Sequence, residues 1–128
     1  MSLLAVELND AGLLLAQPGA DGAPGLVGDE SPGLAVLHEG RVHEGGDAVR
    51  RYRLAPLHAQ NRFWQALSVD ALPWSAGGIA TAADLAHAHL SVVLAPAAQG
   101  DANELLVAVP PGYTREQLGL LVGIANEC

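Results

Sequence analysis

The chain has 128 residues, a length suited to one domain, residues 1–128, with a buried core. Half of its residues are apolar but only 4% are aromatic, so Leu, Val and Ala must build most of that core. The formal charge of −8, with six basic residues that are all Arg, argues against nucleic acid and anionic membrane surfaces as partners.

The residue types that are missing also exclude kinds of site. The chain contains no Lys, so no lysine can contact a nucleotide phosphate. Its one cysteine is Cys128, which excludes an internal disulfide and a cysteine zinc site and favours a reducing compartment. The first apolar run lacks a basic segment and is broken by Glu7, so it predicts neither a signal peptide nor a membrane span. We therefore expect a cytoplasmic protein.

Two apolar runs, residues 3–8 and 13–16, open the chain on either side of the sequence Asn9-Asp10-Ala11-Gly12. Short apolar runs bounded by turn residues predict two buried strands that form a hairpin. Closing that hairpin is a sufficient structural reason for the residues of the turn. The turn also places polar side chains at the mouth of a buried sheet, where a ligand could reach them.

The next part of the chain predicts short elements. Residues 17–32 are rich in Gly and Pro and predict a loop with a brief strand at Leu26-Val27. Residues 33–37 and 41–43 predict a second hairpin. A short helix is expected from about Asp47, a residue suited to capping, and must end before Pro56. Residues 57–67 are consistent with a second short helix or an ordered loop, and Pro73 with Gly77-Gly78 closes that region.

The last part of the chain predicts two longer helices and one strand. Thr81-Ala-Ala-Asp84 is a capping box, and the helix after it must end by Pro96. Residues 104–109 read as a central strand. Thr114-Arg-Glu-Gln117 is a second capping box, which starts a helix over residues 114–126. The apolar residues of this helix recur at helical spacing and predict its buried face: Leu118, Leu121, Val122 and Ala125.

The order of these elements predicts an α/β fold, in which a mixed sheet is formed first by hairpins and is then covered on its faces by helices. Residues 3–8 and 104–109 are expected to be neighbouring parallel strands near the centre of the sheet. A helix precedes the second of these strands, as the crossover between parallel strands requires.

Three stretches, in this order, resemble the first part of the ATPase domain of seventy-kilodalton heat-shock chaperones, within the actin-like ATPase superfamily. Ala5-Val-Glu-Leu-Asn-Asp10 lies where that family has its first phosphate loop. Ser31-Pro-Gly-Leu-Ala-Val-Leu37 followed by Arg41-Val-His-Glu-Gly-Gly-Asp-Ala48 is similar to the family's Ser-Pro strand and Val-Gly-Asp-Ala helix start. Val107-Ala-Val-Pro110 with Tyr113 is similar to its Val-Pro strand end.

The resemblance implies a ribonuclease-H-like fold and a chain that is the N-terminal piece, the first subdomain, of a longer chaperone-like protein. The family's second phosphate loop and adenosine-binding segment have no counterpart here. The remainder of the ATPase domain is therefore the implied partner, together with protein clients of the longer protein. The implied cofactors are ATP and magnesium in that longer protein, and neither is expected to bind this chain alone.

The resemblance also assigns a first phosphate loop, and this loop departs from the family's pattern. Its cofactor-binding positions are Glu7, Asn9, Asp10, Ala11 and Gly12, of which Glu7 would hold the metal through water. Asn9 adds a side chain where close backbone approach is wanted. Asp10 brings a like charge to the phosphates. We therefore expect a degraded loop.

The family's catalytic lysine has its nearest match at Asn61, in the sequence Gln60-Asn61-Arg62-Phe63. An amide cannot supply a cation to a developing phosphate charge. Arg62 could substitute if the register shifted by one residue, although a surface salt bridge fits it better. No catalytic residue is predicted for this chain, and ATP hydrolysis by the full protein stays open.

Three function classes result from this reading. The first is the N-terminal part of a nucleotide-binding, actin-fold ATPase, and the second is a pseudo-ATPase whose fold is a scaffold for protein contacts. The third is a metal-dependent ribonuclease-H-like nuclease. It is disfavoured because Pro110-Pro111 stand where Glu7 and Asp10 would need an acidic partner, and because the negative net charge opposes a nucleic-acid substrate. The histidines predict no metal site, although His38 and His43 could approach across the second hairpin, and no serine lies in a hydrolase motif.

Overall fold

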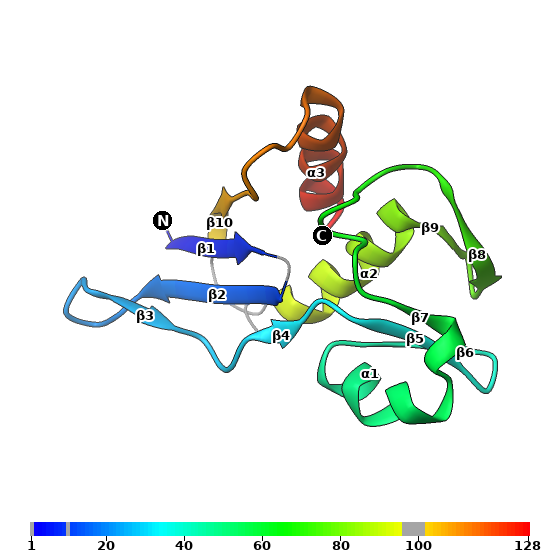
Figure 1. The fold of residues 1–128 in the computed structure, drawn as a ribbon. Helices are drawn as coiled ribbons and strands as arrows, with labels where there is room; N and C mark the ends of the chain where they lie inside the picture. The colour runs from blue at the N-terminus through cyan, green and yellow to red at the C-terminus, as the bar shows by residue number, and fades with distance from the viewer. Residues whose placement is uncertain (1, 10, 96–101) are drawn as a thin grey trace.

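The computed structural model describes residues 2–9, 11–95 and 102–128, so the expectation for Asp10 lies outside the described residues. The main sheet has the strand order β10-β1-β2-β3, and β4 pairs with the same β2 strand (Figure 1). The bounds of its strands are β1 Ser2–Leu8, β2 Gly12–Pro18, β3 Pro24–Leu26, β4 Ser31–Pro32 and β10 Ala102–Ala108.

The first hairpin is confirmed. Strands β1 and β2 pair in antiparallel register, with Val6 opposite Leu15. The backbone groups of Asn9 and Gly12 exchange hydrogen bonds of 3.1 and 3.2 Å, which leaves two residues in the turn between them. The short strand expected at 26–27 is also present, as β3, and is shifted to Pro24–Leu26.

The predicted parallel pairing of the first and last strands is confirmed, but the predicted central position of the last strand is wrong. Strands β1 and β10 are parallel, with Val6 opposite Val107, and β1 lies inside the sheet between β10 and β2. Among the described residues, β10 pairs only with β1 and therefore forms an edge. The reason is that the second hairpin pairs in a separate sheet and supplies no neighbour for β10.

Two smaller sheets hold the middle of the chain. The second hairpin is confirmed, and its three-stranded sheet has the order β6-β5-β7. The β8-β9 hairpin was not expected, and in it Gly77 and Gly78 turn the chain with φ of 58° and 85°. The bounds of these strands are β5 Ala35–His38, β6 Arg41–Glu44, β7 Ala59–Gln60, β8 Ala71–Ala76 and β9 Ile79–Thr81.

The two predicted capping boxes are both formed. Helix α2 (Ala82–Leu94) is capped by Thr81 and Asp84, and helix α3 (Arg115–Glu127) by Thr114 and Gln117. Each box satisfies two backbone N–H groups that the first turn of a helix leaves without partners.

The short helix expected from about Asp47 is present, but its cap is not the expected one. Helix α1 (Gly46–Arg51) starts one residue before Asp47, and its N-cap is Gly45, so the capping role expected for Asp47 is wrong. Segment 57–67 is an ordered loop rather than a second α-helix, since it holds only the 3₁₀ turn η2 (Pro56–His58) and β7. A further 3₁₀ turn, η1 (Tyr52–Leu54), follows α1 directly.

The core lies between one face of the main sheet and helices α2 and α3. It combines Leu4, Val6 and Leu8 of β1 with residues of β2, α2 and α3 and with the Phe63-Trp64 segment. The predicted contact face of α3 is correct at Leu121, which is 4% exposed, and at the half-buried Ala125. It is wrong at Leu118 and Val122, which are 41% and 59% exposed, because Ile124 is buried in their place. The helix is turned so that positions 121 and 124 face the core.

The opposite face of the main sheet is open among the described residues, contrary to the expectation that helices would cover both faces. Cross-strand neighbours share a face, and the register places Leu106, Ala5, Ala16 and Leu26 in one row across β10, β1, β2 and β3. Leu106 and Leu26 at the two ends of this row are 61% and 69% exposed. This open-face row is apolar although half-solvated sheets normally carry polar residues on the open side.

Candidate functional site

A pocket of about 700 Å³ lies where the parallel strands β1 and β10 end. Ligands of α/β proteins bind preferentially beyond the carboxyl ends of parallel strands, so this position is the first to consider. Its lining comes from the end of β1, the segment after β10 and the start of α3: Glu7, Leu8, Asn9, Gln65, residues 108–113 and Gln117. We call it the strand-end pocket.

The side chain of Asn9 is bonded within its own turn. Its Oδ1 accepts hydrogen bonds from the backbone N–H groups of Ala11 and Gly12, at 2.8 and 2.9 Å. Its Nδ2 donates to Oε1 of Glu7 at 3.1 Å. Asn residues commonly bond to the backbone two residues ahead in this way, and the contact explains why this turn is tight.

These bonds decide what the turn can bind. A phosphate loop needs backbone N–H groups that point at the anion and have no other acceptor. Here the amide oxygen of Asn9 already accepts from two of them, so it takes the place that a phosphate oxygen would need. Glu7 is exposed, and one of its two oxygens is engaged by Asn9. The described part of this loop therefore does not fit a magnesium-bound triphosphate.

Three further residues predicted for the nucleotide site, Ala11, Gly12 and Asn61, lie in two places. Ala11 and Asn61 line a second pocket of about 340 Å³, so the turn and the position matched to the family's lysine lie on one cavity. Gly12 lies against β4, where a Cβ atom added to it would be 2.1 Å from the carbonyl oxygen of Ser31. Gly12 thus permits close packing of two strands. The surface salt bridge expected for Arg62 is absent among the described residues.

Three residues that line the strand-end pocket were not predicted as site residues: Gln65, Tyr113 and Gln117. The hydroxyl of Tyr113 donates to the carbonyl oxygen of Trp64, and Nε2 of Gln117 donates to the carbonyl oxygen of Gln65 at 3.2 Å. These bonds tie the start of α3 to the 63–67 segment. The capping box at 114–117 identified Gln117 as a helix start, but no pattern in the sequence indicates its contact with Gln65.

A second polar group lies inside the core and was not expected. His89 is fully buried, its Nδ1 accepts from the indole Nε1–H of Trp64 at 2.8 Å, and its Nε2 lies 2.9 Å from Oγ of Ser31. An indole nitrogen can only donate, so Nδ1 carries no proton and Nε2–H must donate to Ser31. Burial lowers the pKa of His89 to about 4, which keeps the ring neutral.

The tautomer of His89 excludes a hydrolase dyad at this serine. A catalytic histidine takes the proton of its serine through an unprotonated ring nitrogen. In this contact the nitrogen nearest Ser31 already holds a proton, because Trp64 donates to the other nitrogen. The group Ser31, Trp64 and His89 therefore joins β4, the 63–67 segment and α2 as a structural contact.

Two buried polar atoms have no hydrogen-bond partner among the described residues: Oε2 of Glu44 and Nε1 of Trp74. Burial raises the pKa of Glu44 to about 7, because no cation offsets the loss of water around its carboxylate. This carboxyl lies on β6 and lines neither of the two pockets described above.

The histidines behave as separate residues or pairs. His38 and His43 approach across the β5-β6 hairpin, as expected, with ring centroids 6.4 Å apart. His87 lies 3.4 Å from the carboxylate of Glu127, whereas His89 is buried. No group of three or more His, Cys, Asp or Glu side chains within the described ranges is arranged to hold a metal ion.

Within the part of the chain that the structure describes, none of the helices is both long and apolar enough to cross a membrane. Comparison with known proteins adds no relative: no protein-family model matches the chain, and no curated protein is significantly similar to it.

Proposed function

We propose that this chain is the N-terminal part of a chaperone-like, actin-fold protein whose first phosphate loop no longer holds nucleotide. In this proposal the chain is a scaffold for protein contacts and does not hydrolyse ATP. The observation that carries it is the side chain of Asn9, which occupies the N–H groups of Ala11 and Gly12 at 2.8 and 2.9 Å.

The arrangement of strands supports the family part of the proposal. A tight hairpin, a crossover through capped helix α2, a parallel return strand and capped helix α3 follow one another in the order that the resemblance implies. Among the described residues β10 is an edge strand, and an edge strand can pair with a further strand. The remainder of the ATPase domain is the proposed source of that strand, and β10 offers an edge for it.

The site chemistry supports the pseudo-ATPase part. Binding at millimolar concentration needs only about −4 kcal/mol, yet it needs donors that the triphosphate can reach. The loop amides are engaged, Asn61 offers no cation, and the chain has no Lys. ATP and magnesium are therefore proposed for the longer protein only, through segments outside this chain.

The nuclease alternative has less support. Metal-dependent nucleases use several carboxylates that converge on divalent ions. Among the described residues, Glu7 is the single carboxylate that lines the strand-end pocket, and Ala108, Pro110 and Pro111 lie where a second would be needed. The net charge of −8 also opposes a nucleic-acid substrate.

The open-face row supports the scaffold part. Contiguous exposed apolar surface on a soluble domain marks contact sites. Ala5 and Ala16 lie between the exposed Leu106 and Leu26, and the two outer strands are roughly 14 Å apart at about 4.8 Å per strand. A helix about 10 Å across fits between the two leucines.

The chemistry of the scaffold's partner follows from the charges on the same face. Glu7 and Leu3 lie two residues on either side of Ala5 on β1, and Glu104 is the register partner of Leu3. Residues two apart on a strand share a face, so both carboxylates border the open-face row. The proposed partner is therefore an amphipathic helix with an apolar stripe and flanking basic residues.

The loop is tested by following the backbone amide signals of residues 7–12 while magnesium and ATP are added to millimolar concentration. We expect no saturable shift in the wild-type chain, and slow hydrogen exchange at the Ala11 and Gly12 amides. Asn9→Ala should speed that exchange at Ala11, because the Gly12 amide keeps its hydrogen bond to the carbonyl oxygen of residue 9. The control Asn126→Ala, at an exposed position of α3, should change neither amide. A saturable shift of the wild-type loop signals would overturn the proposal.

A further inference from the structure

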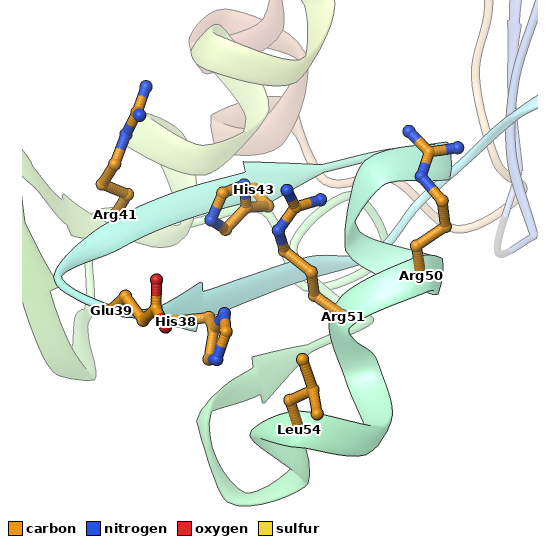
Figure 2. A pocket seen from close by; sticks show the side chains of 7 residues that line it. All are labelled: His38, Glu39, Arg41, His43, Arg50, Arg51 and Leu54. Carbon is orange, nitrogen blue, oxygen red and sulfur yellow. The ribbon is translucent and has the colours of Figure 1, made fainter.

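The strongest unassigned feature is a pocket of about 530 Å³ beside the β5-β6 hairpin and helix α1. Figure 2 shows the side chains of Arg41 and Arg50 on either side of His43 and Arg51. His38 and Glu39 come from the turn of the hairpin, and Leu54 comes from η1. We call it the Arg/His pocket, and it shares no lining residue with the strand-end pocket.

The charge of this pocket is opposite to that of the chain. The chain has six basic residues and a net charge of −8, yet three of its Arg and two of its His line this one cavity. Glu39 is the single carboxylate among the lining residues, and Asp47, outside the lining, contacts His43 and the two arginines of α1. Two carboxylates therefore face three guanidinium groups, and cation remains in excess.

Asp47 positions the cations but cannot satisfy them. Its Oδ1 accepts from both Arg50 and Arg51, and its Oδ2 is 2.9 Å from Nδ1 of His43. The hydrogen bond to His43 and the neighbouring arginines lower the pKa of Asp47, so the carboxylate stays ionised. Each guanidinium has five N–H donors, and Arg50 and Arg51 each use one terminal nitrogen here. Most N–H donors of Arg50 and Arg51 therefore form no hydrogen bond within the described residues and can bind a ligand.

Arg41 differs from the other two arginines. It forms no ion pair with any residue in the described ranges, although it lines the same pocket. It stands directly opposite His38 in the β5-β6 ladder, next to the turn at Glu39 and Gly40. The hairpin thus contributes to the pocket lining a guanidinium without an ion-pair partner in the described ranges.

We infer that the Arg/His pocket binds a phosphate dianion, either as free phosphate or as the phosphate group of a small phosphomonoester. Guanidinium groups form paired, charge-assisted hydrogen bonds with phosphate oxygens. A single carboxylate has fewer acceptor oxygens and less negative charge than a phosphate dianion, so it would engage fewer of the N–H donors. The pocket is larger than one phosphate, and Leu54, which is 67% exposed, offers an apolar surface to the organic part of an ester. This site is independent of the nucleotide loop and of the proposed scaffold.

The test is a titration of the full chain with inorganic phosphate and, separately, with phenyl phosphate, at constant ionic strength. We expect saturable shifts of the amide signals of residues 38–43 and 50–54. Arg41→Gln should weaken phosphate binding about tenfold, the loss of roughly one charge-assisted hydrogen bond. The matched control Arg115→Gln, at the start of α3, removes the same charge outside the pocket and should change the affinity less than about twofold, because salt screens distant charges.

A loss of phosphate binding in Arg41→Gln can be distinguished from a loss of folding. Arg41 has no ion-pair partner among the described residues, so Arg41→Gln should keep the wild-type thermal midpoint, whereas Arg51→Gln also removes a bond to Asp47. Equal weakening by Arg41→Gln and Arg115→Gln would show nonspecific attraction to a charged surface and would overturn the inference. So would the lack of a saturable shift in both titrations.

The two titrations also distinguish the sources of the phosphate group. Tighter binding of phenyl phosphate that is lost in Leu54→Ala would identify a phosphomonoester as the ligand. Equal affinity for the two anions, unaffected by Leu54→Ala, would identify free phosphate. Both results support a phosphate site.

Discussion

At the scale of single residues, His89 shows how one hydrogen bond sets the protonation state of a side chain. Trp64 donates to its Nδ1 at 2.8 Å, and burial lowers its pKa from 6.5 to about 4. A protonated ring would bring a second N–H against the indole N–H and place a charge in the core. The neutral imidazole is therefore required for this packing.

The first prediction concerns the pH dependence of stability. Because the pKa of His89 is lower in the folded state, the unfolded chain binds a proton first as the pH falls below about 6.5. The stability contributed by neutral His89 is then lost between about pH 6.5 and 4 and amounts to roughly 3 kcal/mol, at 1.36 kcal/mol per pKa unit. Urea denaturation measured at several pH values checks this.

Glu44 changes the stability with pH in the direction opposite to His89. The effect of His89 is therefore measured in a variant that lacks the Glu44 carboxyl. Its pKa is raised to about 7, so its contribution is lost as the pH rises from about 4.5 through 7. In Glu44→Gln the loss on acidification should therefore be steeper than in the wild-type chain. If this variant keeps constant stability from pH 7 to pH 4, His89 is not buried as a neutral ring.

The second prediction concerns Gly12. A Cβ atom at this position would lie 2.1 Å from the carbonyl oxygen of Ser31, which is backbone and cannot rotate away. Gly12→Ala should therefore cost several times more than the ~1 kcal/mol of a typical substitution, as measured by chemical denaturation. The matched control is Gly25→Ala in β3, where the added atom meets nothing within 4 Å. Equal effects of the two substitutions would contradict the close approach of β2 and β4.

At the scale of elements, helix α3 shows that the apolar spacing of a helix predicts several possible contact faces, whereas packing against the core selects one of them. At 100° per residue the apolar residues Leu118, Leu121, Val122 and Ile124 span about 160° of the helix circumference, so more than one contact face satisfies the pattern. Contact with the core selects Leu121 and Ile124 and leaves Leu118 and Val122 exposed.

The third prediction uses this difference within one helix. Leu121→Ala removes a side chain that is 4% exposed and should cost about 2–5 kcal/mol. Leu118→Ala removes one that is 41% exposed and should cost less than about 1 kcal/mol. Denaturant midpoints of the two variants, compared with wild type, measure both costs. A larger loss for Leu118→Ala would show that the helix packs through the face expected from the sequence.

Glycines in the same helix give an independent check on its exposed side. Gly119 and Gly123 have open space where a Cβ atom would be added. Since glycine costs roughly 0.5–1 kcal/mol relative to alanine inside a helix, Gly123→Ala should raise the stability of the chain. A loss of stability on this substitution would indicate a neighbour that covers this side of α3.

At the scale of the whole molecule, the main sheet has helices on one face and the open-face row on the other. Leucine at both ends of that row, with 61% and 69% of each side chain exposed, is costly to leave in water. The sequence pattern of β1 and β10 is typical of strands that are buried on both faces, whereas the described residues cover only one face.

The last prediction tests the open-face row as a contact site. A synthetic amphipathic helix with a leucine stripe and flanking lysines should bind the chain, and the same helix with flanking glutamates should bind more weakly because Glu7 and Glu104 border the row. Leu106→Lys should abolish binding of the basic helix in a fluorescence titration. The control Leu57→Lys changes a leucine that is 91% exposed and lies in η2, outside the main sheet. This variant should bind the basic helix as the wild-type chain does. Equal binding by both variants would exclude the row as the contact site.

The sequence by itself determined the elements whose stabilising contacts are local. The turn at residues 9–12 and the capping boxes at Thr81 and Thr114 depend on residues two to four positions apart, so their chemistry is visible in the sequence. The parallel pairing of 3–8 with 104–109 was also predictable, because a crossover helix between two apolar runs favours it.

Only the tertiary structure decided which residues meet across the chain. Ser31 and His89 are 58 positions apart, and Trp64 and His89 are 25 apart, so no spacing in the sequence announces the buried histidine. The edge position of β10 and the rotation of α3 likewise depend on which neighbours fill the space beside them. Burial and hydrogen-bond partners are properties of packed surfaces, and residues distant in the sequence supply those surfaces.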